Sequence, residues 1–165
     1  MLTMLLFIPY VFLAPLAGFL NDRFAKTRWL MGGNLIKLTG TVICALSIWF
    51  GYAWQAPGYL IVGIGSCIYG PAKYGILPEI LPHERLVKAN GTVEILTLLA
   101  IIFGKIAGAK MADTLPLTAC YAIALGVFLT SFSLTLFMRL TPSNPAIRLK
   151  ASLGEFFAHS LDLLR

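Results

Sequence analysis

Charged residues are scarce in this sequence. Of its 165 residues only 12% are Asp, Glu, Lys or Arg, whereas 58% are hydrophobic and the mean hydropathy is +0.83. A soluble domain typically has about 25% charged and about 45–50% apolar residues, so the composition argues against an ordinary soluble protein. The net charge of +6 does not indicate nucleic-acid binding, because the basic residues are scattered between apolar blocks instead of forming one patch.

Cysteine and histidine are also few, which bears on redox and metal chemistry. The three cysteines, Cys44, Cys67 and Cys120, fall inside apolar blocks, where cysteine behaves as a small hydrophobic residue. They are too dispersed for a disulfide framework or a metal site. His83 and His159 have no partner at ligand spacing, and we expect both at the surface. The sequence therefore predicts no metal ion and no cofactor.

Long apolar runs dominate instead. A helix needs about 20 apolar residues to cross a bilayer, and lipid cannot satisfy open backbone groups, which favours helices over any other spanning structure here. The sequence thus predicts an all-α integral membrane protein, a bundle of five transmembrane helices within residues 1–140. The predicted spans are residues 2–20, 29–52, 58–77, 92–112 and 117–140.

Basic residues between the apolar blocks predict the orientation. Lys and Arg occur in the first loop, in the third loop and after the last block, and are absent from the loop between the second and third blocks. The positive-inside rule then places the first loop, the third loop and the tail in the cytoplasm. Five spans leave the N-terminus outside, so we expect the chain to lack its first helix. In the tail, residues 141–165, we expect a cytoplasmic linker and an interfacial amphipathic helix, with a partner-docking helix as the alternative.

A few ionisable side chains interrupt the apolar runs. Each costs about 2.5–3.5 kcal/mol at the centre of a membrane helix. Lys37 shares a helical face with Asn34 and Thr41, and Glu94 and Lys105 are eleven positions apart, which brings them to within about 20° of the same direction. We expect both stripes to face the bundle interior or a water-filled cavity.

Lysine near the end of a span has a second interpretation, because it can extend its ammonium to the lipid phosphates. For Lys73 the two interpretations are balanced, and for Lys110 this one is favoured. Small residues at every fourth position predict close helix packing. They are Ala100, Gly104 and Gly108 in one span, and Ser66 and Gly70, with Gly63 nearby, in another. Asn90 is expected to cap the fourth span.

The loop "GFLNDRFAKTR" resembles the signature loop between helices two and three of the major facilitator superfamily. The matching residues are Gly18, Asp22, Arg23, Lys26 and Arg28, while Ala25 stands where that pattern usually has glycine. The stretches "GPAKYGILPEILP" and "LVKANGTVEI" are similar to the lysophospholipid transporter branch, including forms fused to an acyltransferase and an acyl-carrier-protein synthetase.

This resemblance implies an incomplete N-terminal half of a major facilitator fold, helices two to six of twelve. It implies a secondary carrier that flips lysophospholipids from the outer to the inner leaflet of the bacterial inner membrane. The expected partners are the lipid bilayer, the lysophospholipid and a missing C-terminal half or acyltransferase. Asp22 and Arg23 would belong to a cytoplasmic gate. With them we group Gly18, Lys26, Arg28, Glu79, Lys88 and Asn90.

A lysophospholipid offers a phosphate and one acyl chain. Its phosphate needs cations along a hydrated path, whereas the tail stays in lipid. We therefore expect the substrate to be bound by Asn34, Lys37, Lys73, Glu94 and Lys105.

Three other interpretations stay open. The chain could belong to a carrier for another organic anion or drug, or it could be a non-functional remnant. It could also be the membrane part of a phospholipid acyltransferase. For the last, the His-x4-Asp pair of such enzymes is absent, because Lys88 and Leu164 stand five positions after the two histidines. We therefore expect no enzymatic activity in this chain.

Overall fold

The computed structural model describes residues 6, 9–10, 12–13, 17–18, 21 and 24–138. Within residues 24–138 the chain forms helices joined by short turns, and no strand occurs among the described residues. The elements are α2 (Lys26–Phe50), the 3-10 turn η2 (Tyr52–Trp54), α3 (Gln55–Gly75), α4 (Leu77–Ile80), the 3-10 turn η3 (His83–Arg85), α5 (Leu86–Thr114) and α6 (Leu117–Leu136).

Four helical stretches among the described residues are long and apolar enough to cross a membrane. They are Lys26–Phe50, Tyr52–Ile80, His83–Thr114 and Leu117–Leu136. The predicted class, an all-α membrane bundle, is confirmed. The first predicted span lies mostly outside the described residues and the tail 141–165 entirely outside them, so the count of five spans and the interfacial helix stay predictions.

The start of α5 differs from the sequence prediction. The helix begins at Leu86, directly after η3, and Arg85 occupies the N-cap position without a side-chain capping bond. Pro82 is extended, with φ −66° and ψ 151°, and the turn that follows it leads straight into the helix. Asn90 therefore lies inside α5 with an exposed side chain, and its predicted capping role is wrong.

Helices α2 and α3 run antiparallel and touch through glycines. A Cβ added at Gly33 would lie 3.0 Å from the carbonyl oxygen of Gly65, and one added at Gly40 would lie 2.9 Å from that of Gly58. Real Cβ atoms almost never come this close to backbone, so the two helices approach as closely as they do because these positions have no side chain. Small residues allow such backbone approach in membrane helices.

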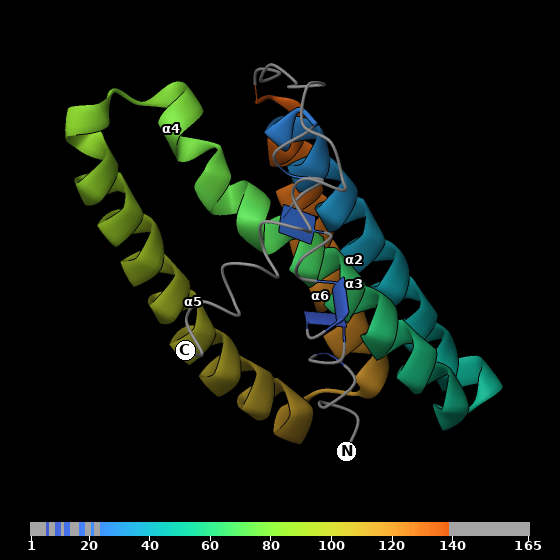
Figure 1. Cartoon of the computed structure of the whole chain (residues 1–165). Coiled ribbons are helices and arrows are strands. Elements are labelled where there is room, and N and C mark those ends of the chain that lie inside the picture. Colours follow the sequence, from blue (N-terminus) through green and yellow to red (C-terminus); the bar gives the residue numbers. More distant parts are fainter. Residues whose placement is uncertain are drawn as a thin grey trace, which may run out of the picture.

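The remaining long helices are placed differently with respect to this pair. Helix α6 packs along α2, and α5 runs apart from both, joined through α4 to α3 at one end and to α6 at the other (Figure 1). No residue of α5 is buried within the described part of the chain. The described fold is thus a packed group of α2, α3 and α6 with α5 as an outlying arm.

Candidate functional site

Lys37 lies on the face of α2 that turns toward the packed group. Its Nζ is 3.7 Å from the centre of the Tyr69 ring on α3 and 5.8 Å from that of the Phe128 ring on α6. Aromatic faces attract cations through their quadrupole. Lys37 is half-buried and has no hydrogen-bond acceptor or ion-pair partner among the described residues. Its three N–H donors are therefore free to bind an anion.

Lys73 lies one turn further along α3 than Tyr69, on the same face. Its Nζ donates a hydrogen bond of 2.9 Å to Thr97 Oγ1 on α5 and lies 4.6 Å from the centre of the Tyr74 ring. The ammonium of Lys37, on α2, thus lies over Tyr69, and Lys73 follows Tyr69 one turn later on α3.

Glu94 is a carboxylate on α5 that contacts this stretch of α3. It accepts a hydrogen bond from the Tyr74 hydroxyl, while Thr97, one turn later, accepts the bond from Lys73. Both contacts join α3 to α5, and they are the side-chain hydrogen bonds between these helices in the described chain. Glu94 is exposed and makes no ion pair among the described residues, so it is available to a cationic group.

Asn34 is buried between α2 and α6, at 1% exposure. Its Nδ2 donates to Thr135 Oγ1 at 3.0 Å, and Thr135 donates in turn to the carbonyl oxygen of Ser131. The Oδ1 atom of Asn34 is buried without a partner among the described residues. Asn34 therefore fastens α6 to α2 one turn before Lys37.

The other proposed substrate residue, Lys105, lies apart from this group. It is exposed on α5 and has no partner among the described residues. The ammonium of Lys37 thus lies against the same stretch of α3 that holds Lys73. Lys73 and Glu94 both take part in hydrogen bonds between α3 and α5, whereas Lys105 stays separate.

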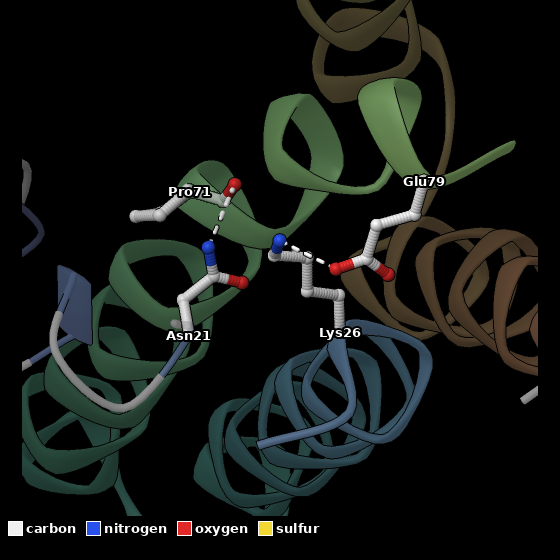
Figure 2. A network of polar contacts seen from close by, with 4 residues as sticks. All are labelled: Asn21, Lys26, Pro71 and Glu79. Carbon is white, nitrogen blue, oxygen red and sulfur yellow. Dashed lines mark hydrogen bonds and ion pairs between the residues drawn. The ribbon is translucent and has the colours of Figure 1, made fainter. Parts of the chain in front are cut away.

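A second polar cluster connects the start of α2 with α3 and α4 (Figure 2). Lys26 Nζ and Glu79 Oε1 form an ion pair at 2.5 Å, with side chains 17% and 21% exposed. Beside it Asn21 Nδ2 approaches the carbonyl oxygen of Pro71 at 3.5 Å. Two residues predicted for the gate are therefore ion-paired across 53 positions of sequence.

Gly75 makes room for this cluster. A Cβ at this position would lie 2.8 Å from Asn21 Nδ2 and 3.2 Å from Lys26 Cε. The predicted gate residues Asp22 and Arg23 lie outside the described residues. The remaining ones are either exposed or half-buried, and none has an ion pair in the described chain: Gly18, Arg28, Lys88 and Asn90.

Sequence reasoning missed several neighbours of these residues. Tyr69 and Thr97 contact the two lysines, and Asn21 joins the ion-paired cluster. For Tyr69 the sequence held a signal, because its spacing of four positions from Lys73 in a helical stretch puts both side chains on one face. Nothing in the sequence indicated which residue of α5 would meet Lys73.

The site offers cations and aromatic rings. Among the described residues, no group of three or more His, Cys, Asp or Glu could hold a metal ion. Two lysine ammonium groups, one free of hydrogen bonds, can bind a phosphate. The site is therefore suited to binding an anion within a membrane.

The chain is similar to known membrane proteins. The sequence model described as Major Facilitator Superfamily matches residues 1–162. The chain is 42% identical over 139 residues to the lysophospholipid transporter LplT of Serratia proteamaculans, which covers 84% of the chain and 33% of that protein. The same-named protein of Yersinia enterocolitica is 39% identical over 163 residues, 94% of the chain and 38% of that protein. That of Escherichia fergusonii is 47% identical over 116 residues, 70% of the chain and 28% of that protein.

The chain spans about one third of the length of these curated relatives. The family match and the four apolar helices of the described part identify a multi-pass protein of the bacterial inner membrane. The chain belongs to the Major Facilitator Superfamily.

Proposed function

We propose that this chain is part of a secondary carrier that moves lysophospholipids from the outer to the inner leaflet of the bacterial inner membrane. The relatives named as lysophospholipid transporters support the substrate class. The observation that carries the proposal is the free ammonium of Lys37, held against Tyr69 with no hydrogen-bond acceptor among the described residues. A lysine in this state within an apolar bundle is poised for an anionic group.

The headgroup phosphate is the part of the substrate that needs this help. Its charge is costly in hydrocarbon, whereas the acyl chain is at home there. Charge-assisted bonds from Lys37 and Lys73 would replace the water that the phosphate gives up. Because the Lys37 ammonium lies over Tyr69 and Lys73 follows one turn later on the same face of α3, the phosphate would pass from Lys37 to Lys73.

The remaining proposed residues have supporting roles. Glu94 would accept an ethanolamine ammonium, since it is bonded to Tyr74 alone among the described residues. Asn34 would hold α6 beside Lys37 through Thr135. Lys105, exposed further along α5, would meet the headgroup at another depth.

The gate would be the cluster at the start of α2. The Lys26–Glu79 ion pair ties α2 to α4, and breaking it would free the two helices to separate. The other gate residues proposed from sequence are Gly18, Asp22, Arg23, Arg28, Lys88 and Asn90. Alternating access needs two halves that move about a central site, so the partner would be a C-terminal half. An acyltransferase would then use the delivered lysolipid, and the chain itself would make no covalent bond.

The test is uptake of radiolabelled lysophosphatidylethanolamine by spheroplasts whose chromosomal copy carries Lys37→Gln or Lys73→Gln. A hydrogen bond to a charged group contributes about 1.5–3 kcal/mol, so each variant should lower uptake about tenfold or more. The matched control is Lys110→Gln, which removes an exposed lysine near the end of α5.

A soluble organic anion is tested in parallel. Uptake of the lysolipid and not of the soluble anion supports the proposal. If both lysine variants take up the lysolipid as the wild type does, or if only the soluble anion is carried, the proposal is wrong.

A further inference from the structure

The junction between α4 and α5 holds a groove that lies apart from Lys37 and Lys73, and of its lining residues only Lys88 is also proposed for the gate. It has a volume of about 590 Å³. Its walls combine two basic side chains, one hydroxyl and three apolar residues: Arg85, Lys88, Thr92, Leu81, Ala89 and Val93. The groove therefore offers both positive charge and an apolar wall.

Both basic side chains are free to bind a ligand. Arg85 and Lys88 are exposed, and neither has an ion pair or a side-chain hydrogen bond within the described part of the chain. With Thr92 they recur at three- and four-residue steps, which puts them on one face of the first turns of α5. Two carboxylates lie near in sequence. Glu79 is already paired with Lys26, and Glu84 does not line the groove.

The helix itself adds positive potential at this point. The first turn of α5 has no acidic residue and its N-cap offers no side-chain acceptor. The N–H of Leu86 donates to the carbonyl oxygen of His83, and the helix dipole places partial positive charge at this end of α5. Two unpaired cations and this helix end act on the same groove.

The position of the groove at the membrane surface indicates the class of ligand. The groove opens at the end of a membrane-spanning helix, in the loop that the positive-inside rule places in the cytoplasm. Basic pockets at that level of a membrane protein attract anionic headgroups. Leu81 and Val93 would lie against the glycerol and upper acyl region of a lipid.

We propose that this groove binds an anionic phospholipid of the cytoplasmic leaflet, with its phosphodiester between Arg85 and Lys88. The site is separate from Lys37 and Lys73 and does not depend on the transport proposal. Because Leu81 is the C-cap of α4 and Lys88 lies in the first turn of α5, the bound lipid would hold the α4–α5 junction in one arrangement.

The test is native mass spectrometry of the full chain in detergent, titrated with phosphatidylglycerol or phosphatidylcholine. The wild type should bind phosphatidylglycerol more tightly. Each basic residue near an anionic membrane surface adds attraction equivalent to about fivefold in affinity. Arg85→Gln and Lys88→Gln should therefore each weaken phosphatidylglycerol binding about fivefold.

Two controls separate charge from fold. Lys110→Gln removes one charge at the opposite end of α5 and should leave binding unchanged. Lys88→Arg keeps the charge and should bind as the wild type does. Equal binding of both lipids, or no loss in the Gln variants, would overturn the proposal. Displacement of the lipid by millimolar inorganic phosphate would also overturn it, because the site would then be one for free phosphate.

Discussion

Helix pair α2–α3 and helix α5 use glycine in opposite ways. On α2 and α3, four glycines let the two backbones meet, and a Cβ at any of them would come within 3.0 Å of a neighbour: Gly33, Gly40, Gly58 and Gly65. On α5, a Cβ at Gly104 or Gly108 would meet no atom within 4 Å in the described chain. A row of small residues is thus a packing surface only where another helix lies opposite.

The comparison extends to polar contacts. In the packed group, the side-chain amide of Asn34 donates a buried hydrogen bond to Thr135. Helix α5 is joined to α3 by hydrogen bonds through exposed Glu94 and half-buried Thr97. The chemistry of the proposed carrier lies where these two regions meet, because Lys73 is on α3 and its hydrogen-bond acceptor is on α5.

The largest expected effect comes from filling the glycine contact. In Gly58→Ala the new Cβ would lie 2.8 Å from the backbone nitrogen of Cys44 and 2.9 Å from the carbonyl oxygen of Gly40. Overpacking of this kind costs about 1–3 kcal/mol. Thermal unfolding in detergent should show a clear loss of stability.

The matched control is Gly108→Ala on α5, where the added methyl meets nothing in the described chain. It should leave the melting temperature unchanged or raise it slightly, because alanine favours helix over glycine. Equal destabilisation by both substitutions would remove the distinction between the two regions.

The next largest loss of stability is expected from removing the buried hydrogen bond between Asn34 and Thr135. Asn34→Ala removes the bond to Thr135, and interhelical hydrogen bonds in membrane proteins contribute about 0.6–1.7 kcal/mol. Chemical unfolding in mixed micelles should detect this loss. Thr130→Ala is the control, since that hydroxyl bonds only within α6, to the carbonyl oxygen of Gly126, and a comparable loss there would refute an interhelical role for Asn34.

A smaller coupling is expected in the cytoplasmic cluster. A double-mutant cycle with Lys26→Gln and Glu79→Gln should give about 0.2–1 kcal/mol, the range for pairs that are partly open to solvent. High salt should weaken it. Arg28→Gln paired with Glu79→Gln should give no coupling, because Arg28 has no ion pair among the described residues. A coupling as large for Arg28 as for Lys26 would contradict the pairing.

The smallest effect concerns the α5 arm. Tyr74→Phe removes the hydroxyl that donates to Glu94, and exposed substitutions usually change stability by less than about 0.5 kcal/mol. The readout is local, as amide exchange around Glu94 should become faster while that of α2 is unchanged. Tyr52→Phe, an exposed tyrosine outside this contact, should alter neither rate. Unchanged exchange at Glu94 would mean that Tyr74 does not hold α5.

Hydropathy and helical spacing predicted much of this arrangement. The spacing of Asn34, Lys37 and Thr41 put them on one face, and the structure buries Asn34 and Thr41 there. The four glycines of the contact were missed because the expected rows, Ala100–Gly104–Gly108 and Ser66–Gly70, follow four-residue steps. Gly33 and Gly40, like Gly58 and Gly65, are seven apart. Which helix lies opposite a small-residue row is a property of tertiary packing, and a single sequence does not contain it.

The capping prediction failed for a local reason. An Asn before an apolar run is typical of an N-cap, but the turn after Pro82 starts the helix earlier, at Leu86. Contacts of the signature loop depend on residues far along the chain. The pairing of Lys26 with Glu79, 53 positions away, has no local signal.

Equilibrium binding of lysophosphatidylethanolamine to the purified chain in lipid nanodiscs tests the proposed headgroup site most directly. With Lys37 and Lys73 both changed to Gln, affinity should fall at least tenfold relative to the wild type, as expected for lost bonds to a charged group of about 1.5–3 kcal/mol each, while Lys110→Gln should bind as the wild type does. Unchanged affinity in the double variant, or an equal loss in the control, would contradict the assignment of these two lysines to the headgroup.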